Sequence, residues 1–208
     1  ACKEGRDRFH AAVSRAGITS DWHEADGDAA ENIAIHTRYA DLAVVGQWSP
    51  DETPEQQPRD LAALVALSAG RPVLMLPYAG DHTLSFERVM LCWDGSREAV
   101  RAAHDMLGML PHGSSVDIVC IDPEDSEDRD PGADIARHLA SHGLKVDAHR
   151  MSKGDITIAD TLLSASADLG SDLIVLGAYG HARMREIAFG GTTRAMLANA
   201  PLPLLLSH

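Results

Sequence analysis

The chain has 208 residues, of which 45% are hydrophobic, so it can bury the core of one large or two small domains. Its formal net charge of −13 argues against a nucleic-acid partner, because phosphate binding over a broad surface needs a basic patch. No apolar run approaches the ~20 residues of a membrane-spanning helix, so we expect no membrane partner.

The three cysteines are Cys2, Cys92 and Cys120. Cys92 and Cys120 each lie inside an apolar run, and the sequence contains no CxxC motif or Cys/His cluster. This usage predicts reduced, buried thiols in a cytoplasmic protein rather than a disulfide or a metal site.

Six short apolar runs are rich in branched residues and continuous rather than alternating, which is typical of strands covered on both faces. In chain order they span residues 42–45, 73–76, 89–92, 116–121, 173–176 and 202–206. Helical stretches are predicted between them at 97–110, with Ser96 as N-cap, and at 134–141, 155–169 and 192–200. Strands that alternate with helices predict an α/β fold with doubly wound parallel sheets.

The sequence contains an internal repeat. Residues 41–46 read DLAVVG and residues 172–177 read DLIVLG, an offset of 131 residues, and 71–77 resembles 200–206 at nearly the same offset. The repeat predicts two related domains, 1–80 and 86–208, separated by a short turn-rich segment.

The first repeat is expected to be incomplete. If the second domain begins at Phe86, its counterpart would begin about 45 residues before Ala1. We therefore expect domain 1–80 to lack its opening strand, helix and second strand, and expect upstream residues in the natural protein. A half-sheet alone would expose apolar surface and an unpaired edge.

A glycine-rich segment follows the strand that ends at Leu176. Gly177 and Gly180 allow the backbone to turn sharply and to approach a ligand. A helix start follows nine residues later, where free backbone N–H groups and the positive end of the helix dipole favour an anion. The segment therefore predicts a phosphate site, completed by Gly190, Gly191, Thr192 and Thr193.

Asp94 follows the predicted strand 89–92. A carboxylate there can accept hydrogen bonds from ribose hydroxyls, or it can serve as a turn residue before the next helix; both readings stay open. His138 and His142 lie four residues apart, which suits a metal or, as we expect, an exposed helix face. The acidic segment 122–134 is expected to be a mobile, solvated loop.

The run Gly177-x2-Gly180-x9-Gly190 resembles the nucleotide-binding signature of the universal stress protein family. Residues 88–94, 119–122 and 201–206 resemble that family's first, second and last strands. The likeness covers 86–208 and, in weaker form, 17–77, as in tandem-domain members. It implies five parallel strands of order 3-2-1-4-5 in the C-terminal domain, with ATP or AMP in one crevice.

By this resemblance, Asp94 holds the ribose, the Cys120 backbone contacts adenine, and Gly177 passes close to the ribose. The phosphates, with which Mg²⁺ can be bound, are held by Gly180, Gly190, Gly191, Thr192 and Thr193. The family often has Ser or Thr where this chain has Gly191. The first repeat lacks the glycines, since Gln47, Trp48 and Ser49 follow Gly46, so we expect it to bind no nucleotide and to serve as a structural partner.

No nucleophile–base–orienter set and no paired carboxylates accompany the predicted site. We expect a stress-response binding or signalling module with at most slow ATP hydrolysis, no catalytic residues and no resident metal site. The alternatives are a nucleotide-free assembly protein and, least favoured, a nucleotide-dependent α/β enzyme. The resemblance also implies that strands 72–77 and 201–206 pair within the chain as a pseudo-dimer, and that edge strands form a homodimer.

Overall fold

The computed structural model describes residues 2–51, 60–80, 84–123, 132–180 and 191–208. The first repeat contains α1 (Cys2–Ala16), α2 (Ala29–Thr37), β1 (Ala43–Gly46), α3 (Leu61–Ala69) and β2 (Val73–Leu76). The second repeat contains β3 (Arg88–Cys92), α4 (Arg97–Leu107), β4 (Ser115–Ile121), α5 (Ala133–Ser141), β5 (Lys145–Met151), α6 (Ile158–Asp168), β6 (Leu173–Gly177), α7 (Gly191–Asn199) and β7 (Leu204–Ser207).

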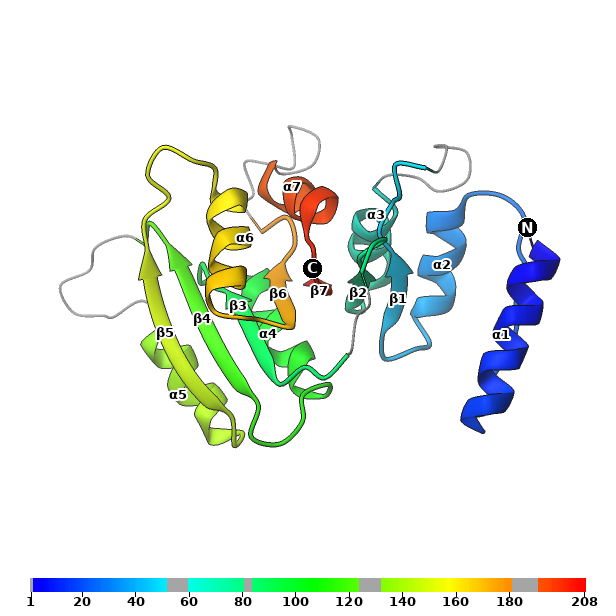
Figure 1. Cartoon of the computed structure of the whole chain (residues 1–208), viewed down its shortest axis with the longest axis horizontal. Coiled ribbons are helices and arrows are strands. Elements are labelled where there is room, and N and C mark those ends of the chain that lie inside the picture. Colours follow the sequence, from blue (N-terminus) through cyan, green and yellow to red (C-terminus); the bar gives the residue numbers. More distant parts are fainter. Residues whose placement is uncertain (1, 52–59, 81–83, 124–131, 181–190) are drawn as a thin grey trace.

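The strands of both repeats form one seven-stranded sheet of order β1-β2-β7-β6-β3-β4-β5 (Figure 1). Within the second repeat the order β5-β4-β3-β6-β7 is parallel throughout. Numbered within that repeat, this is the predicted order 3-2-1-4-5, so the fold prediction is confirmed. In the first repeat, β1 and β2 are also parallel, with Ala43 opposite Val73.

The two repeats meet where β2 and β7 pair in antiparallel register, with Leu74 opposite Leu205. This confirms the predicted pairing of 72–77 with 201–206 within the chain. The sheet is therefore mixed rather than purely parallel. Because β2 and β7 already use each other's edges, a homodimer would have to use another surface. Whether 1–80 and 86–208 fold as separate domains stays a prediction.

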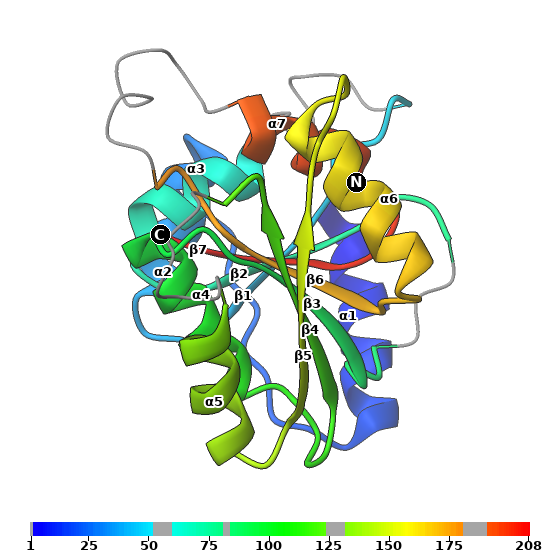
Figure 2. The ribbon, with the colours of Figure 1, turned by 90° about the vertical axis from the view of Figure 1, so that its left-hand side faces the viewer.

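Helices cover both faces of the sheet (Figure 2). One core joins the inward side chains of α2, α3, α6 and α7 to one face, with Met75 and Ile174 fully buried between them. The other core joins α4 and α5 to the opposite face around Leu91 and Ile118. The first core contains residues of both repeats, so apolar burial joins the repeats in addition to the pairing of β2 with β7.

Side chains cap the helices where the sequence changes from strand to helix. The Ser96 hydroxyl accepts from the Ala99 N–H at 3.1 Å at the start of α4, which confirms the predicted N-cap. The Asp28 carboxylate accepts from the Glu31 N–H at 2.8 Å at the start of α2. Helix α4 ends at Leu107 rather than at the predicted residue 110, since Gly108 follows as the C-cap.

The elements that were not predicted from the sequence include α1, α3 and β5. β5 is the outer strand next to β4 and carries Lys145, Asp147 and Arg150, so it has no continuous apolar run. α1 lies at the far end of the molecule from β5 (Figure 1) and is held by the contact of Phe9 with Trp22, whose ring centroids are 5.3 Å apart.

The thiols of Cys92 and Cys120 are buried and form no disulfide, as predicted. Within the part of the chain that the structure describes, every helix is too short or too polar to cross a bilayer. Most of the acidic segment 122–134 lies outside the described residues.

Candidate functional site

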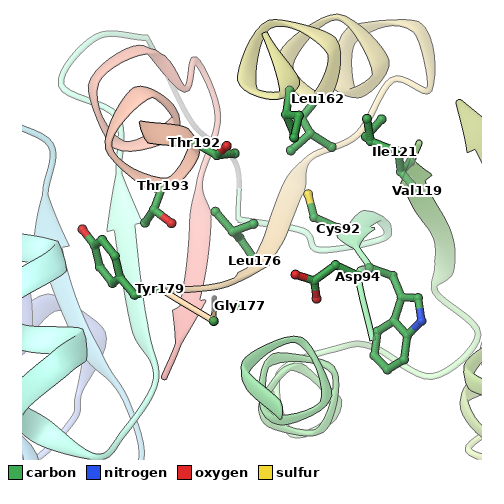
Figure 3. A pocket seen from close by; sticks show the side chains of 13 residues that line it. Cys92, Asp94, Val119, Ile121, Leu162, Leu176, Gly177, Tyr179, Thr192 and Thr193 are labelled. Carbon is green, nitrogen blue, oxygen red and sulfur yellow. The ribbon is translucent and has the colours of Figure 1, made fainter. Parts of the chain in front are cut away.

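A pocket of about 330 Å³ opens at the carboxyl ends of β3 and β6 (Figure 3). The chain leaves β3 toward β4 on one side, and β6 lies on the other side of β3, so the strand order reverses between these two strands. Ligands of open α/β sheets bind at such a switch point. The pocket volume is within the range of small-molecule sites, ~300–1,000 Å³.

Five of the predicted site residues line this pocket: Asp94, Gly177, Gly180, Thr192 and Thr193. They come from the end of β3, from the end of β6 and the turn after it, and from the first turn of α7. The fold thus brings together residues that are about a hundred positions apart in the sequence. Figure 3 shows the Asp94 carboxylate on the α4 side of the pocket and the two threonines at α7.

The wall between these polar groups is apolar and was not predicted from the sequence. Side chains of β3, β4, α6 and β6 form it: Cys92, Val119, Ile121, Ile158, Leu162 and Leu176. Ile158 and Leu162 are four residues apart and so face the same side of α6. Ile158 is 38% exposed although it is a large apolar residue, a sign that it faces a cavity and not the core. Trp93 and Tyr179 add aromatic surface.

The Asp94 carboxylate accepts a hydrogen bond from the Ser96 N–H at 2.9 Å. It therefore serves as a turn residue before α4, one of the two readings of the sequence. It is also exposed and lines the pocket, so the same carboxylate can accept from a ligand hydroxyl. The two roles are compatible in one side chain.

The start of α4 packs closely against Gly177 and Gly180. A Cβ on Gly177 would lie 2.4 Å from the Ala99 nitrogen, and one on Gly180 would lie 2.9 Å from Glu98 Oε2. Real Cβ atoms do not come so close, and the obstacle at Gly177 is backbone, so β6 can pack on the start of α4 only with glycine at this position. At Gly180 the nearest atom is the end of a side chain. This packing closes one side of the pocket.

Among the described residues that line the pocket, the charged side chain is the acidic Asp94. None of the described lining side chains is basic. The Glu98 carboxylate is buried beside Gly180 and lies 3.6 Å from Arg97 Nη2. Burial, together with the charge of Asp94, raises the pKa of the Cys92 thiol to about 12. Cys92 is therefore protonated at neutral pH and acts as part of the apolar wall.

Three of the predicted site residues, Cys120, Gly190 and Gly191, are not among the described residues that line the pocket. The Cys120 side chain is buried in the core on the opposite face of β4, so only its backbone is available on the pocket side. Gly191 is the first residue of α7, and a Cβ there would meet no atom within 4 Å. Gly190 lies outside the described residues.

His138 and His142 lie on an exposed face of α5 and its C-terminus, as expected, with ring centroids 4.9 Å apart. Among the residues the structure describes, no group of three or more His, Cys, Asp or Glu side chains is arranged to hold a metal ion.

Comparison of the fold with solved structures identifies its relatives. A universal stress protein from Archaeoglobus fulgidus matches with a TM-score of 0.69 and 19% identity over 99% of this chain and 75% of that chain. A putative universal stress protein from Pseudomonas aeruginosa matches with a TM-score of 0.62 and 14% identity over 100% and 78%.

The chain has the universal stress protein fold. A functionally unknown protein from Pseudomonas aeruginosa has the same fold, with a TM-score of 0.60 and 14% identity over 100% of this chain and 78% of that chain. No protein-family model matches the sequence, and no curated protein is significantly similar to it. The likeness to the stress proteins is therefore one of architecture, and it extends over both repeats.

Proposed function

We propose that the pocket at the ends of β3 and β6 binds an adenine nucleotide, ATP or AMP, and that the chain is a binding or signalling module of a stress response. The supporting observation is the set of chemical groups that the pocket brings together. They are a carboxylate at Asp94, the N-terminal turn of α7 and an apolar wall. A nucleotide has a matching part for each of them: the ribose hydroxyls, the phosphate and the flat base.

In this proposal Asp94 accepts from the ribose hydroxyls, and the wall at Val119, Ile121 and Leu162 buries the adenine beside the Cys120 backbone. The phosphates bind the backbone N–H groups and hydroxyls at Thr192 and Thr193, where α7 begins. Gly177, Gly180 and Gly191 provide backbone without side chains at the polar end.

A divalent cation such as Mg²⁺ is part of the proposal for ATP, because the described charges at the pocket are carboxylates. The chemistry proposed is binding. The thiol of Cys92 is protonated at neutral pH, so it is not an activated nucleophile.

Calorimetry on protein stripped of bound small molecules tests the proposal. We expect AMP and ATP to bind in the micromolar range, and Asp94→Asn to weaken AMP binding about tenfold, the effect of losing a hydrogen bond to a charged group. A dideoxy-AMP that lacks both ribose hydroxyls should bind wild type and Asp94→Asn equally. The control is Asp168→Asn, an exposed site on α6. Absence of heat with both nucleotides would reject the proposal.

The second candidate is a nucleotide-free assembly protein. The carboxylates of Asp94 and Glu98 favour it, because they repel phosphate. Mass spectrometry of small molecules that co-purify with the protein separates the two candidates, since only the first predicts a bound nucleotide. Two finer points belong to the proposal. One is a cytoplasmic location, supported by two buried cysteines that form no disulfide. The other is a homodimer that uses the outer strands β1 or β5.

A further inference from the structure

Gln47 links the first repeat to the helix that begins at the pocket. It follows β1 directly and is 6% exposed. Its side-chain nitrogen donates to the Leu197 carbonyl at 2.8 Å and lies 3.5 Å from the Ala200 carbonyl. Its side-chain oxygen accepts from the Tyr78 N–H at 3.3 Å. The amide is therefore fixed on both sides.

Leu197 lies in the last turn of α7 and Ala200 directly follows the helix, where backbone carbonyls have no partner within the helix. Gln47 thus supplies a donor that α7 itself cannot provide. The side chain spans 150 positions of sequence to do so. Burial strengthens the constraint, because a buried amide that lost these acceptors would remain unsatisfied.

A second contact holds the N-terminal end of the same helix. Asp60, which precedes α3, lies 3.7 Å from Arg194 Nε in the first turns of α7. Tyr179, which lines the pocket, lies close to both charges: burial raises the pKa of Tyr179 to about 12, Asp60 adds to this rise, and Arg194 opposes it. Helices α3 and α7 are in contact along the joint core (Figure 1).

The internal repeat shows what Gln47 replaces. Gly46 and Gln47 correspond to Gly177 and Ala178, and both second positions make the same backbone bond. The Gln47 N–H donates to the Leu76 carbonyl at 2.7 Å, and the Ala178 N–H donates to that of Ser207 at 2.7 Å. In the second repeat this position opens the glycine-rich turn, while in the first it carries a side chain that reaches the other repeat.

We infer that the first repeat positions α7, and with it the phosphate end of the pocket, and that Gln47 is the positioning residue. The inference rests on the proposed nucleotide site for its ligand. A nine-residue helix is a rigid rod of about 13 Å. Loss of the contact at its C-terminal end therefore displaces the N–H groups at its N-terminal end.

Calorimetry with AMP and adenosine on the full chain tests the inference. Gln47→Met keeps the side-chain length and removes both donors. We expect AMP affinity to fall about fivefold to tenfold, the usual effect of one buried hydrogen bond, and adenosine affinity to stay within about twofold, because adenosine has no phosphate for α7 to hold. General loosening of the fold would weaken both ligands alike.

Thr37→Val is the matched control. Thr37 is also buried in the first repeat, and its hydroxyl donates to the Ile33 carbonyl at 2.7 Å within α2, away from α7. We expect it to leave the ratio of AMP to adenosine affinity unchanged. If Gln47→Met does not fold, Gln47→Asn, which keeps the amide but shortens its reach, replaces it with the same expected loss.

Hydrogen exchange of the ligand-free proteins gives a second readout. We expect the amides of α7 to exchange faster in Gln47→Met, while those of α4 keep their wild-type rates. Unchanged exchange in α7, or equal weakening of AMP and adenosine, would overturn the inference. If wild type binds neither ligand, the proposed function fails, and faster exchange confined to α7 still supports the positioning role of Gln47.

Discussion

Gly177 is the residue at which packing and the proposed site meet. An alanine there would place its Cβ 2.4 Å from the Ala99 nitrogen, and the obstacle is backbone. We expect Gly177→Ala to lower the free energy of unfolding by about 2 kcal/mol or more, as overpacking in a rigid contact does. Urea denaturation measures this change.

Gly46 is the matched control, because it holds the same position in the first repeat and a Cβ there would meet no atom within 4 Å. We expect Gly46→Ala to change the unfolding free energy by less than about 0.5 kcal/mol. Equal losses in the two variants would show that the close approach of β6 to α4 is not what requires glycine at 177.

The raised pKa of the Cys92 thiol predicts that the folded protein loses stability at alkaline pH. Its pKa rises from 9.0 to about 12 on folding, chiefly through burial and then through the charge of Asp94. Below pH 9 the thiol is protonated in both states and the contribution is complete. Between pH 9 and 12 only the unfolded state loses the proton, so the folded state becomes less stable.

Urea titrations between pH 8 and 10 measure how steeply the free energy of unfolding falls with pH. Tyr179 contributes mainly above this range, because its pKa rises from 10.0 to about 12 on folding. We expect the slope to be smaller in Cys92→Ala than in wild type, whatever the variant's absolute stability. An unchanged slope would mean that Cys92 titrates alike in the folded and unfolded states.

The sequence predicted the polar half of the candidate site and not its apolar half. Asp94 and Gly177 could be found because each lies at the carboxyl end of a predicted strand, where ligands of open α/β sheets bind. Ile158 and Leu162 could not be told apart from core residues by residue type alone. The Cys120 side chain shows the converse limit, since a strand position does not reveal which face a side chain takes until the register is known.

At the scale of elements, α6 carries part of the apolar wall and begins at a reciprocal cap. The Thr157 hydroxyl accepts from the Asp160 N–H at 3.1 Å and donates to its carboxylate at 2.7 Å. We expect Thr157→Ala to lower the unfolding free energy by about 1 kcal/mol. Thermal unfolding measures the loss.

Ser164→Ala is the comparison, because Ser164 is exposed within the same helix and alanine is the better helix former. It should have no effect or raise stability slightly. If Thr157→Ala is as stable as Ser164→Ala, the cap contributes nothing.

The sequence predicted the buried strands better than the exposed one. The buried strands, such as β4 and β6, could be predicted because both faces are covered and their apolar runs are continuous. β5 could not, because it is an outer strand with charged residues along it. Helix α3 is apolar on nearly all sides, so it has no periodic face by which a helix is usually identified.

At the scale of the molecule, one sheet and one shared core join the repeats. We therefore expect a single unfolding transition in urea. Trp48 reports on the first repeat and Trp93 on the second, after Trp22→Phe is combined with Trp93→Phe or with Trp48→Phe. Their fluorescence midpoints should coincide. Two separate midpoints would show that the antiparallel β2–β7 pairing does not couple the repeats.

The repeat in the sequence predicted two related units, and the family resemblance implied that 72–77 pairs with 201–206, as the β2–β7 pairing confirms. The contact of Gln47 with α7 could not be predicted, since it depends on where the end of β1 and the end of α7 meet in space. It is this contact that gives the glycine-poor repeat a role in the proposed site.

A crystal structure of the chain grown with AMP tests the central claim most directly. We predict the nucleotide in the pocket between β3 and β6, with the adenine against Val119 and Ile121, the ribose at Asp94, and the phosphate at Thr192 and Thr193. An empty pocket at saturating AMP, or a nucleotide bound elsewhere on the molecule, would contradict the account.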